Sequence, residues 1–278
     1  MGKCISFWGP LSGQAATTSN VLAVGTLLGA EYTTKKTLVT HTHLMNSTLE
    51  HGYFKKDSFT KSNLINFNDF GLDALARHAS SKKLEPAMIQ DYTHHVLNKL
   101  DILFGTKKNE ESAEELNGLL KNIFENCSRE YDLTLIDVIS GTENPSTNTV
   151  LQNSDLIVVC LNQNVTLLDR FFIEKEWNQI LREVPVVIML GQYDRDSHLT
   201  IGNIVRKYKY KGPVYALPRC SNFMDAYNES SVAEFYMRNR NIDRRDGDYF
   251  FFEETRRMTK GILNHLGLNV KSQSDQGA

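Results

Sequence analysis

The chain has 278 residues, 41% hydrophobic and 23% charged, an ordinary composition for a globular protein with a full core. Its 31 basic and 33 acidic side chains give a formal net charge of −2, which excludes a global positive field for nucleic acid. No apolar run approaches the roughly 20 residues that span a bilayer, and residues 1–7 read as a strand rather than a signal peptide. We expect a cytoplasmic protein with four reduced, mostly buried thiols, at Cys4, Cys127, Cys160 and Cys220.

Short apolar runs alternate with longer helical patterns along the whole chain, as in βαβ units. We expect strands near residues 4–8, 37–41, 101–104, 132–137, 155–160, 185–190 and 213–217. We expect helices near residues 17–29, 70–78, 85–99, 111–127, 166–182, 199–207, 229–236 and 249–266. The sequence therefore predicts an α/β fold with a doubly wound, mostly parallel twisted sheet flanked by helices. This single domain spans residues 1–268, and residues 269–278 form a disordered tail.

A segment of small residues, Gly9–Ala16, separates the first predicted strand from the first predicted helix. Such a loop at a helix N-terminus forms an anion cradle, because backbone N–H groups and the helix dipole converge on one point. A Walker A loop adds a lysine for the β- and γ-phosphates and a hydroxyl for Mg²⁺. Ala16 stands at the lysine position. The residues that we assign to a vestigial or weak nucleotide site here are Gly13, Gln14, Ala15, Ala16, Thr17 and Thr18.

This segment resembles the deviant Walker A motif of MinD/ParA-type P-loop ATPases, a G-K-G-G-V-G-K-T-T type sequence. The resemblance places the family's signature lysine at Leu11 and its phosphate-loop lysine at Ala16, so both cations are absent. Cationic contacts contribute much of the free energy of phosphate binding and of transition-state stabilisation. The resemblance therefore implies the fold of an ATPase without its usual phosphate-binding charges.

The resemblance extends to the next two strand ends of the family. Residues 35–43 resemble its second strand, but His41 and His43 replace the closing Asp-x-Asp. Two histidines on one strand face are able to ligate a metal, yet without an identifiable third ligand we expect incidental polar residues. Residues 131–137 resemble the Walker B strand and put Asp137 on the Mg²⁺ side. The resemblance implies that Thr17 and Asp137 hold Mg²⁺ only when nucleotide binds.

The likeness reaches the C-terminal third of the chain. Residues 190–195 resemble the L-N-x-Y-D-R segment that reads adenine, with Asp194 retained and Gly191 in place of the base-bonding asparagine. Pro218 belongs to a segment that resembles the loop closing over the base. Within the family, the nearest likeness is to the CpaE/TadZ branch, which is associated with localising Tad-type pilus machinery. Residues 71–75, 91–93, 100–106 and 197–204 carry it.

Three functions remain open from the sequence. The first is a pseudo-ATPase that positions, scaffolds or regulates pilus or secretion machinery, without a catalytic residue or a cofactor. The second is a weak Mg²⁺-dependent ATP- or ADP-binding protein that draws a cation from Arg195, Arg219 or a partner subunit. The third is a ParA-type DNA-partitioning protein. Its only candidate surface is the basic run 207–211, which strand alternation explains more simply, so nucleic-acid binding is not expected.

The resemblance also implies a protein partner and a homodimer. Family members dimerise face to face across two nucleotides, and Leu11 cannot act as the signature lysine, so we expect self-association that is insensitive to ATP. The last predicted helix interleaves Arg256, Arg257 and Lys260 with apolar residues, a pattern of helices that lie on a membrane surface. Packing of this helix against the sheet is the simpler interpretation.

Overall fold

The computed structural model describes residues 1–32, 35–44, 47–55, 70–106, 110–175 and 179–268. The tail predicted at residues 269–278 lies outside the described residues. The four cysteines are free and buried, as the sequence predicts.

Eight strands form one sheet in the order β3-β4-β2-β5-β1-β6-β7-β8. The strands are β1 (Lys3–Trp8), β2 (Thr37–His41), β3 (His94–Leu97), β4 (Leu100–Ile102), β5 (Leu133–Asp137), β6 (Leu156–Leu161), β7 (Val186–Tyr193) and β8 (Val214–Pro218). Every neighbouring pair is parallel except β3 with β4. The chain leaves β1 in one direction for β2 and later reaches β6 on its other side. Ligands of open α/β sheets bind beyond the strand carboxyl ends where the order reverses in this way.

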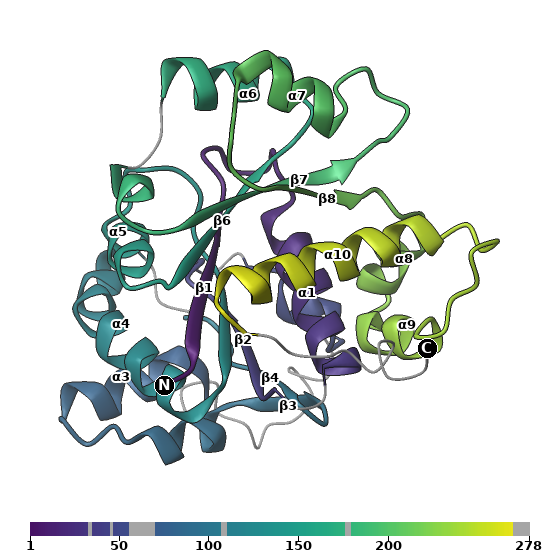
Figure 1. Ribbon diagram of the computed structural model, residues 1–278. Helices are drawn as coiled ribbons and strands as arrows, with labels where there is room; N and C mark the ends of the chain where they lie inside the picture. Colours follow the sequence, from purple (N-terminus) through teal and green to yellow (C-terminus); the bar gives the residue numbers. More distant parts are fainter. Residues whose placement is uncertain (33–34, 45–46, 56–69, 107–109, 176–178, 269–278) are drawn as a thin grey trace.

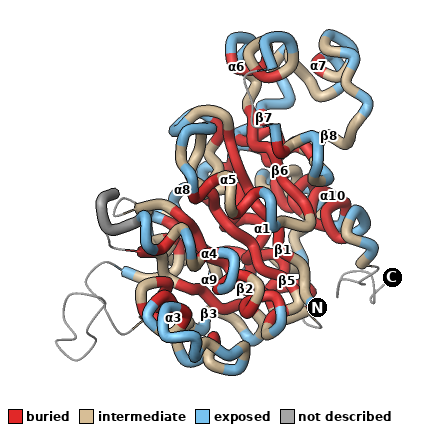
Figure 2. Tube along the Cα trace, turned by 90° about the vertical axis from the view of Figure 1, so that its left-hand side faces the viewer, coloured by how far each residue is buried: buried red, intermediate tan, exposed pale blue. Residues whose placement is uncertain are grey.

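Helices cover both faces of the sheet (Figure 1). On one face lie α1 (Thr17–Glu31), α8 (Ser221–Asn228), α9 (Val232–Arg238) and α10 (Tyr249–His265). On the other face lie α3 (Gly71–Ser80), α4 (Glu110–Glu130), α5 (Pro145–Gln152), α6 (Val165–Asp169) and α7 (Ile201–Tyr208). Alternate residues of β1 point to opposite faces of the sheet. Ile5 and Phe7 belong to the hydrophobic core on the α1 side, whereas Cys4 and Trp8 belong to the core on the α4 side. The central strands are buried along their length (Figure 2), which confirms the doubly wound α/β prediction.

Three local expectations are wrong. The helix predicted at 85–99 is a 3₁₀ helix, Pro86–Tyr92, followed by β3, whose His94 stacks on Phe104 at 4.2 Å between ring centroids. The helix predicted at 166–182 is broken into α6, a π turn (Arg170–Glu174) and a 3₁₀ turn (Gln179–Arg182). The basic run 207–211 is a helix end rather than a strand, since Lys209 adopts the left-handed region after α7.

Helix α10 packs its apolar side against the sheet and α1. Phe252 and Met258 are fully buried, and Arg256 forms a bidentate ion pair with Glu31 at 2.6–2.9 Å. This arrangement favours the packed-helix interpretation of the C-terminal pattern over contact with a membrane. Among the described residues, no helix has both the length and the apolarity needed to cross a bilayer.

Candidate functional site

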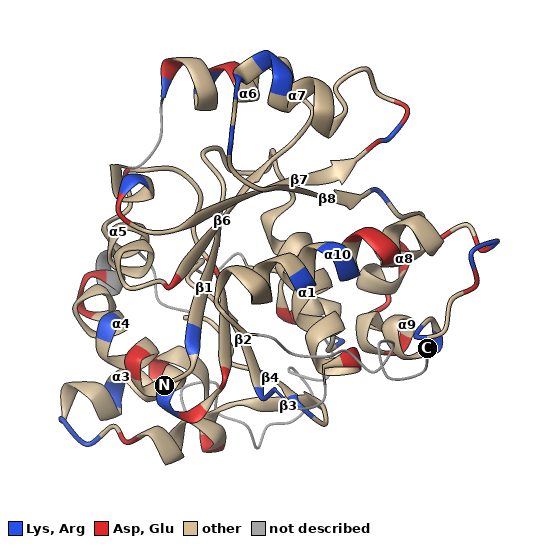
Figure 3. Ribbon diagram, in the orientation of Figure 1, with Lys and Arg blue, Asp and Glu red and all other residues tan. Residues whose placement is uncertain are grey.

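The loop between β1 and α1 presents open backbone donors at the carboxyl end of the sheet. It contains no charged residue from Gly9 to Asn20 (Figure 3). Helix α1 has no side-chain cap, and the amides of Gly13–Ser19 have no hydrogen-bond acceptor in the described part of the chain. The first intrahelical bond joins the Asn20 amide to the Ala16 carbonyl at 3.0 Å. These open donors form the backbone part of the predicted anion cradle.

Two asparagines set the direction of the loop peptides. Asn162 Nδ2 donates to the Gln14 carbonyl at 2.6 Å, and Asn20 Nδ2 donates to the Ala15 carbonyl at 3.1 Å. The C=O and N–H of a trans peptide point in opposite directions. The two bonds therefore turn the amides of Ala15 and Ala16 away from the asparagines. Ala16 itself adopts the left-handed region, with φ 51° and ψ 40°.

Asp137 ends β5 and is fully buried beside the first turn of α1. The Thr18 hydroxyl, rather than that of Thr17, donates to its Oδ2 at 2.6 Å. Its Oδ1 has no hydrogen-bond partner in the described structure, although His43 Nε2 lies 3.3 Å away. Thr17 lies instead beside the Cys160 thiol. The Mg²⁺ pair that the resemblance implies, Thr17 with Asp137, is therefore not joined by a direct bond.

His41, at the end of β2, forms a buried ion pair with Glu50. Its Nε2 lies 2.7 Å from Glu50 Oε1, which also accepts from the Gly105 amide at 3.2 Å. Burial lowers the pKa of His41, but Glu50 and Asp137 raise it more, so the net pKa lies above its ordinary value. Burial raises the pKa of Glu50, but His41 brings the net value down to about 2. The pair is a charged unit in which each member stabilises the ionised form of the other.

The flat His41 ring fits because residue 105 is a glycine: a Cβ on Gly105 would lie 1.9 Å from His41 Cε1. We expected incidental polar residues at this strand end, but Glu50 engages His41 in a buried pair. In the described ranges no three His, Cys, Asp or Glu residues gather closely enough to hold a metal ion.

Gly191, which the resemblance places where a side chain would bond to the base, lies against the loop between β1 and α1. A Cβ on Gly191 would lie 2.4 Å from the Ala15 carbonyl and 3.0 Å from Asn20 Nδ2. No side chain fits there without displacing backbone. Asp194 is exposed, and its backbone exchanges two hydrogen bonds with Gln163, at 2.7 and 2.9 Å.

The other base-side residues lie at the same edge of the sheet. Pro218 is buried at the end of β8 and pairs in register with Tyr193. The two arginines that we considered as substitute cations are engaged elsewhere or exposed. Arg195 stacks on Phe250 at 5.2 Å, and Arg219 is an exposed residue whose amide donates to the Tyr193 carbonyl at 3.1 Å. Neither contact directs an arginine toward the amides of Gly13–Ser19.

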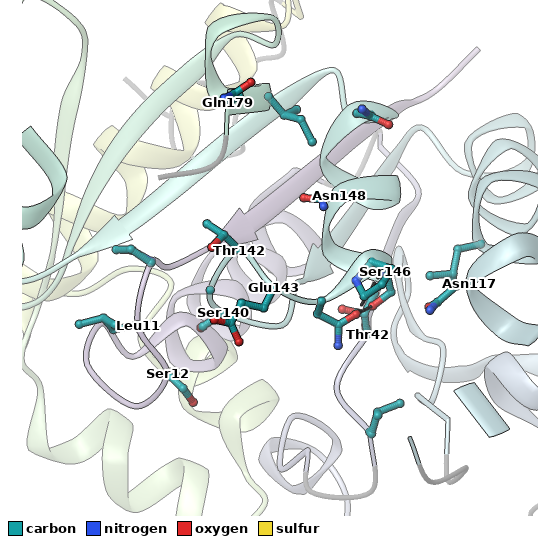
Figure 4. Close-up of a pocket in the computed structure, with 18 of the residues that line it drawn as sticks. Leu11, Ser12, Thr42, Asn117, Ser140, Thr142, Glu143, Ser146, Asn148 and Gln179 are labelled. Carbon is teal, nitrogen blue, oxygen red and sulfur yellow. Dashed lines mark hydrogen bonds between the residues drawn. The ribbon is translucent and has the colours of Figure 1, made fainter. Parts of the chain in front are cut away.

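An open groove of about 1400 Å³ lies beside the tip of the phosphate loop (Figure 4). One wall comes from the loop tip and another from the segment between β5 and α5. Helix α4 and the residues Arg170, Lys175, Gln179 and Ile180 complete the groove. Its lining mixes apolar residues with hydroxyl and amide side chains, which include Ser12, Thr42, Asn117, Ser140, Thr142, Asn148 and Gln179. The residues from Gly13 to Thr18 do not line this groove, so it is distinct from the anion cradle.

Several residues of this site escaped sequence reasoning. Glu50 begins a short 3₁₀ helix (Glu50–Gly52) after β2 and belongs to no motif. Asn20, Asn162 and Trp8 act through contacts with residues distant in sequence or with backbone groups. Of these residues, Trp8 was the easiest to predict from the sequence, because a buried tryptophan needs a hydrogen-bond acceptor for its N–H.

Comparison with models of known protein families and with curated protein sequences found no match. Solved structures do match. The cell division ATPase MinD of Pyrococcus furiosus aligns with a TM-score of 0.68 at 14% identity, over 95% of this chain and 99% of that one. A putative plasmid partition protein of Borrelia burgdorferi, bound to AMPPNP, has a TM-score of 0.63 at 15% identity, over 96% and 98%. A chain of the MinC:MinD complex of Aquifex aeolicus has a TM-score of 0.62 at 13% identity, over 94% and 96%.

At these identities the likeness concerns the fold, and it extends over almost the whole of each chain. The topology, the uncapped loop before α1 and the position of Asp137 at the end of β5 agree with it. The chain therefore has the fold of the MinD/ParA-type P-loop ATPases.

Proposed function

We propose that this chain is a MinD/ParA-like pseudo-ATPase that acts as a positioning, scaffolding or regulatory protein. One observation carries the proposal: the cradle offers open amides from Gly13 to Ser19, but neither lysine nor arginine stands in the loop. Amides supply only partial charges, whereas a triphosphate requires full positive charges for tight binding and for transfer. Leu11 and Ala16 therefore leave the phosphates without their counter-charge.

Two further features support this proposal. His41 and Glu50 neutralise each other where the resemblance implies a carboxylate that orients water or metal. Gly191 contacts the phosphate loop so closely that an adenine-reading side chain has no room. Charge, metal and base recognition are thus each weakened at separate residues.

The proposed partner is another protein, and its identity is open. MinD of Aquifex aeolicus occurs in a complex with MinC, so a protein of this fold does bind a protein partner. The likeness to the CpaE/TadZ branch favours a cytoplasmic role in positioning pilus or secretion machinery. Self-association of this chain is proposed to be independent of ATP, because Leu11 replaces the lysine that would reach a partner's nucleotide. Light scattering that finds an ATP-driven dimer would contradict this.

The test is isothermal titration of the purified chain with ATP and with ADP, each with and without Mg²⁺. We expect no heat at millimolar nucleotide and no thermal-shift response. Micromolar binding would overturn the proposal and show that a cation from elsewhere completes the site. Hydrolysis assays on Thr17→Ala and Asp137→Ala would then establish whether the bound nucleotide turns over.

A second candidate function is weak, Mg²⁺-dependent binding of ATP or ADP. The open amides and Oδ1 of Asp137 favour it. This oxygen accepts no hydrogen bond, although His43 Nε2 lies 3.3 Å away, and a carboxylate oxygen is a ligand that a hard cation prefers. This candidate predicts that Mg²⁺ strengthens nucleotide binding in the unmodified chain but not in Asp137→Asn. Equal affinity with and without Mg²⁺ would exclude it.

A further inference from the structure

Trp8 ties the segment that follows β5 to the end of β1. Its side chain is fully buried, and its indole N–H donates to the Gly141 carbonyl at 2.8 Å. The Gly141 amide donates in turn to the Gly9 carbonyl at 3.0 Å. Both polar backbone groups of Gly141 are thus bonded to β1 and the residue that follows it. We call these two bonds the latch.

The rest of this segment is anchored in the same way. The Val138 amide donates to the Phe7 carbonyl at 2.9 Å, and the Ile139 amide donates to the Thr42 hydroxyl at 3.1 Å. The Ile139 carbonyl accepts from the Thr147 hydroxyl at 3.0 Å. Hydrogen bonds to β1, Gly9, Thr42 and Thr147 therefore anchor residues 138–141.

Gly141 adopts φ +89°, a conformation that favours glycine. Space is not the reason, because a Cβ at this position would meet nothing closer than the Pro10 carbonyl at 4.0 Å. Glycine is favoured here because of the backbone conformation. At this φ the Gly141 carbonyl accepts from Trp8 and the Gly141 amide donates to Gly9.

Part of the latched segment lines the groove: Ser140, Gly141 and Thr142 belong to its lining, together with Leu11 and Ser12 of the neighbouring loop. Figure 4 shows Ser140 and Thr142 beside Leu11. In nucleotide-driven switches, segments beside the phosphate are ordered by contacts to the ligand and released when these are lost. In this chain, Gly141 of the corresponding segment is bonded to Trp8 and Gly9 of the protein itself.

We propose that Trp8 is a positioning residue that fixes residues 138–142, and hence this wall of the groove, whether or not the cradle is occupied. The inference rests on the proposed function and deepens it, since a positioning protein without turnover needs a partner surface that does not wait for nucleotide. The groove wall is then a permanent feature of the chain rather than a ligand-gated one.

Hydrogen–deuterium exchange of the full chain, read on peptides covering residues 138–144, tests the latch. We expect slow exchange that Mg²⁺-ATP leaves unchanged. Trp8→Phe keeps an aromatic ring but removes the donor, so exchange of this segment should become about ten-fold faster. Phe251→Leu is the matched control: it trims a buried aromatic side chain in the core on the other face of the sheet and should leave the segment's exchange unchanged.

Gly141→Ala changes the acceptor residue of the latch instead of the donor, and it replaces Trp8→Phe as the test if that variant fails to fold. It should also accelerate exchange of the segment, because an alanine disfavours φ +89°. Fast exchange in the unmodified chain, or slowing by Mg²⁺-ATP, would overturn the latch. Titration calorimetry on the same samples separates the two proposals. Nucleotide binding with unchanged exchange would refute the pseudo-ATPase and support the latch.

Discussion

The anion cradle and the His41–Glu50 pair lie at the same edge of the sheet and differ in what they leave unsatisfied. The amides of Gly13–Ser19 have no acceptor in the described part of the chain, whereas the Glu50 carboxylate is bonded to the His41 imidazole and the Gly105 amide. Main-chain geometry places free N–H groups wherever a strand, a turn and a helix follow one another, whatever the side chains are. A charge at the same place requires a particular side chain.

On the proposed function, this contrast separates the groups that the fold itself supplies from those that depend on particular side chains. The open amides come with the topology, whereas the resemblance implies other side chains at Ala16, Gly191 and His41. The Ala15 carbonyl lies close against Gly191. Variants that restore or remove single groups test this division.

The largest effect is expected from Gly191→Asn, which would restore the base-reading side chain that the resemblance implies. Its Cβ would lie 2.4 Å from the Ala15 carbonyl, so the loop must shift. We expect a loss of about 3 kcal/mol in the free energy of unfolding, measured by urea denaturation, and no gain in nucleotide binding. Gly202→Ala is the control, since a Cβ there meets nothing within 4 Å. Unchanged stability together with new adenine binding would show that the base site is open.

Glu50→Gln tests the His41–Glu50 pair by removing one of its two charges. We expect a loss of about 2 kcal/mol near pH 5.5, because His41 is left protonated without its carboxylate or must give up its proton. The comparison of urea midpoints between this variant and the unmodified chain measures the loss.

The loss should depend on pH in a direction set by the two pKa shifts. The raised pKa of His41 gives stability that is complete below its ordinary pKa of 6.5 and fades as pH rises through its folded value. The lowered pKa of Glu50 gives stability that is present above 4.5 and fades as pH falls toward 2. The difference between Glu50→Gln and the unmodified chain should therefore be largest between pH 4.5 and 6.5. A difference that grows steadily toward alkaline pH would contradict the ion pair.

Ala16→Lys tests whether the open amides still form a working cradle. A cation at this position should tighten triphosphate binding by about ten-fold, the effect of one charge-assisted hydrogen bond. Titration calorimetry measures it. Gln14→Lys puts the same charge elsewhere on the exposed loop and should have a smaller effect. Equal gains from both variants would mean that charge alone, and not the direction of the amides, attracts phosphate.

The sequence predicted the fold from periodic patterns, and it predicted the loop between the first strand and the first helix from a run of small residues. All seven expected strands exist, and the loop at Gly9–Ala16 stands before α1. The sequence did not predict β3, because His94–Leu97 becomes a strand through pairing with β4 and ring stacking on Phe104. It also missed Glu50 and the Trp8 latch. Such contacts join residues without a shared motif, and only the folded chain brings them together.

The smallest effect is expected from Ala16→Gly, which tests the backbone shape of the cradle. A non-glycine residue in the left-handed region costs roughly 1 kcal/mol, whereas glycine also raises the entropy of the unfolded chain. We therefore expect a net gain of about 0.5 kcal/mol in the free energy of unfolding, measured by urea denaturation. Gly13→Ala is the mirror variant: at φ +72°, with no atom within 4 Å of its Cβ, it should lose about 1 kcal/mol. If Ala16→Gly instead weakened the chain as glycine does inside a helix, the left-handed turn that aims the amides would not exist.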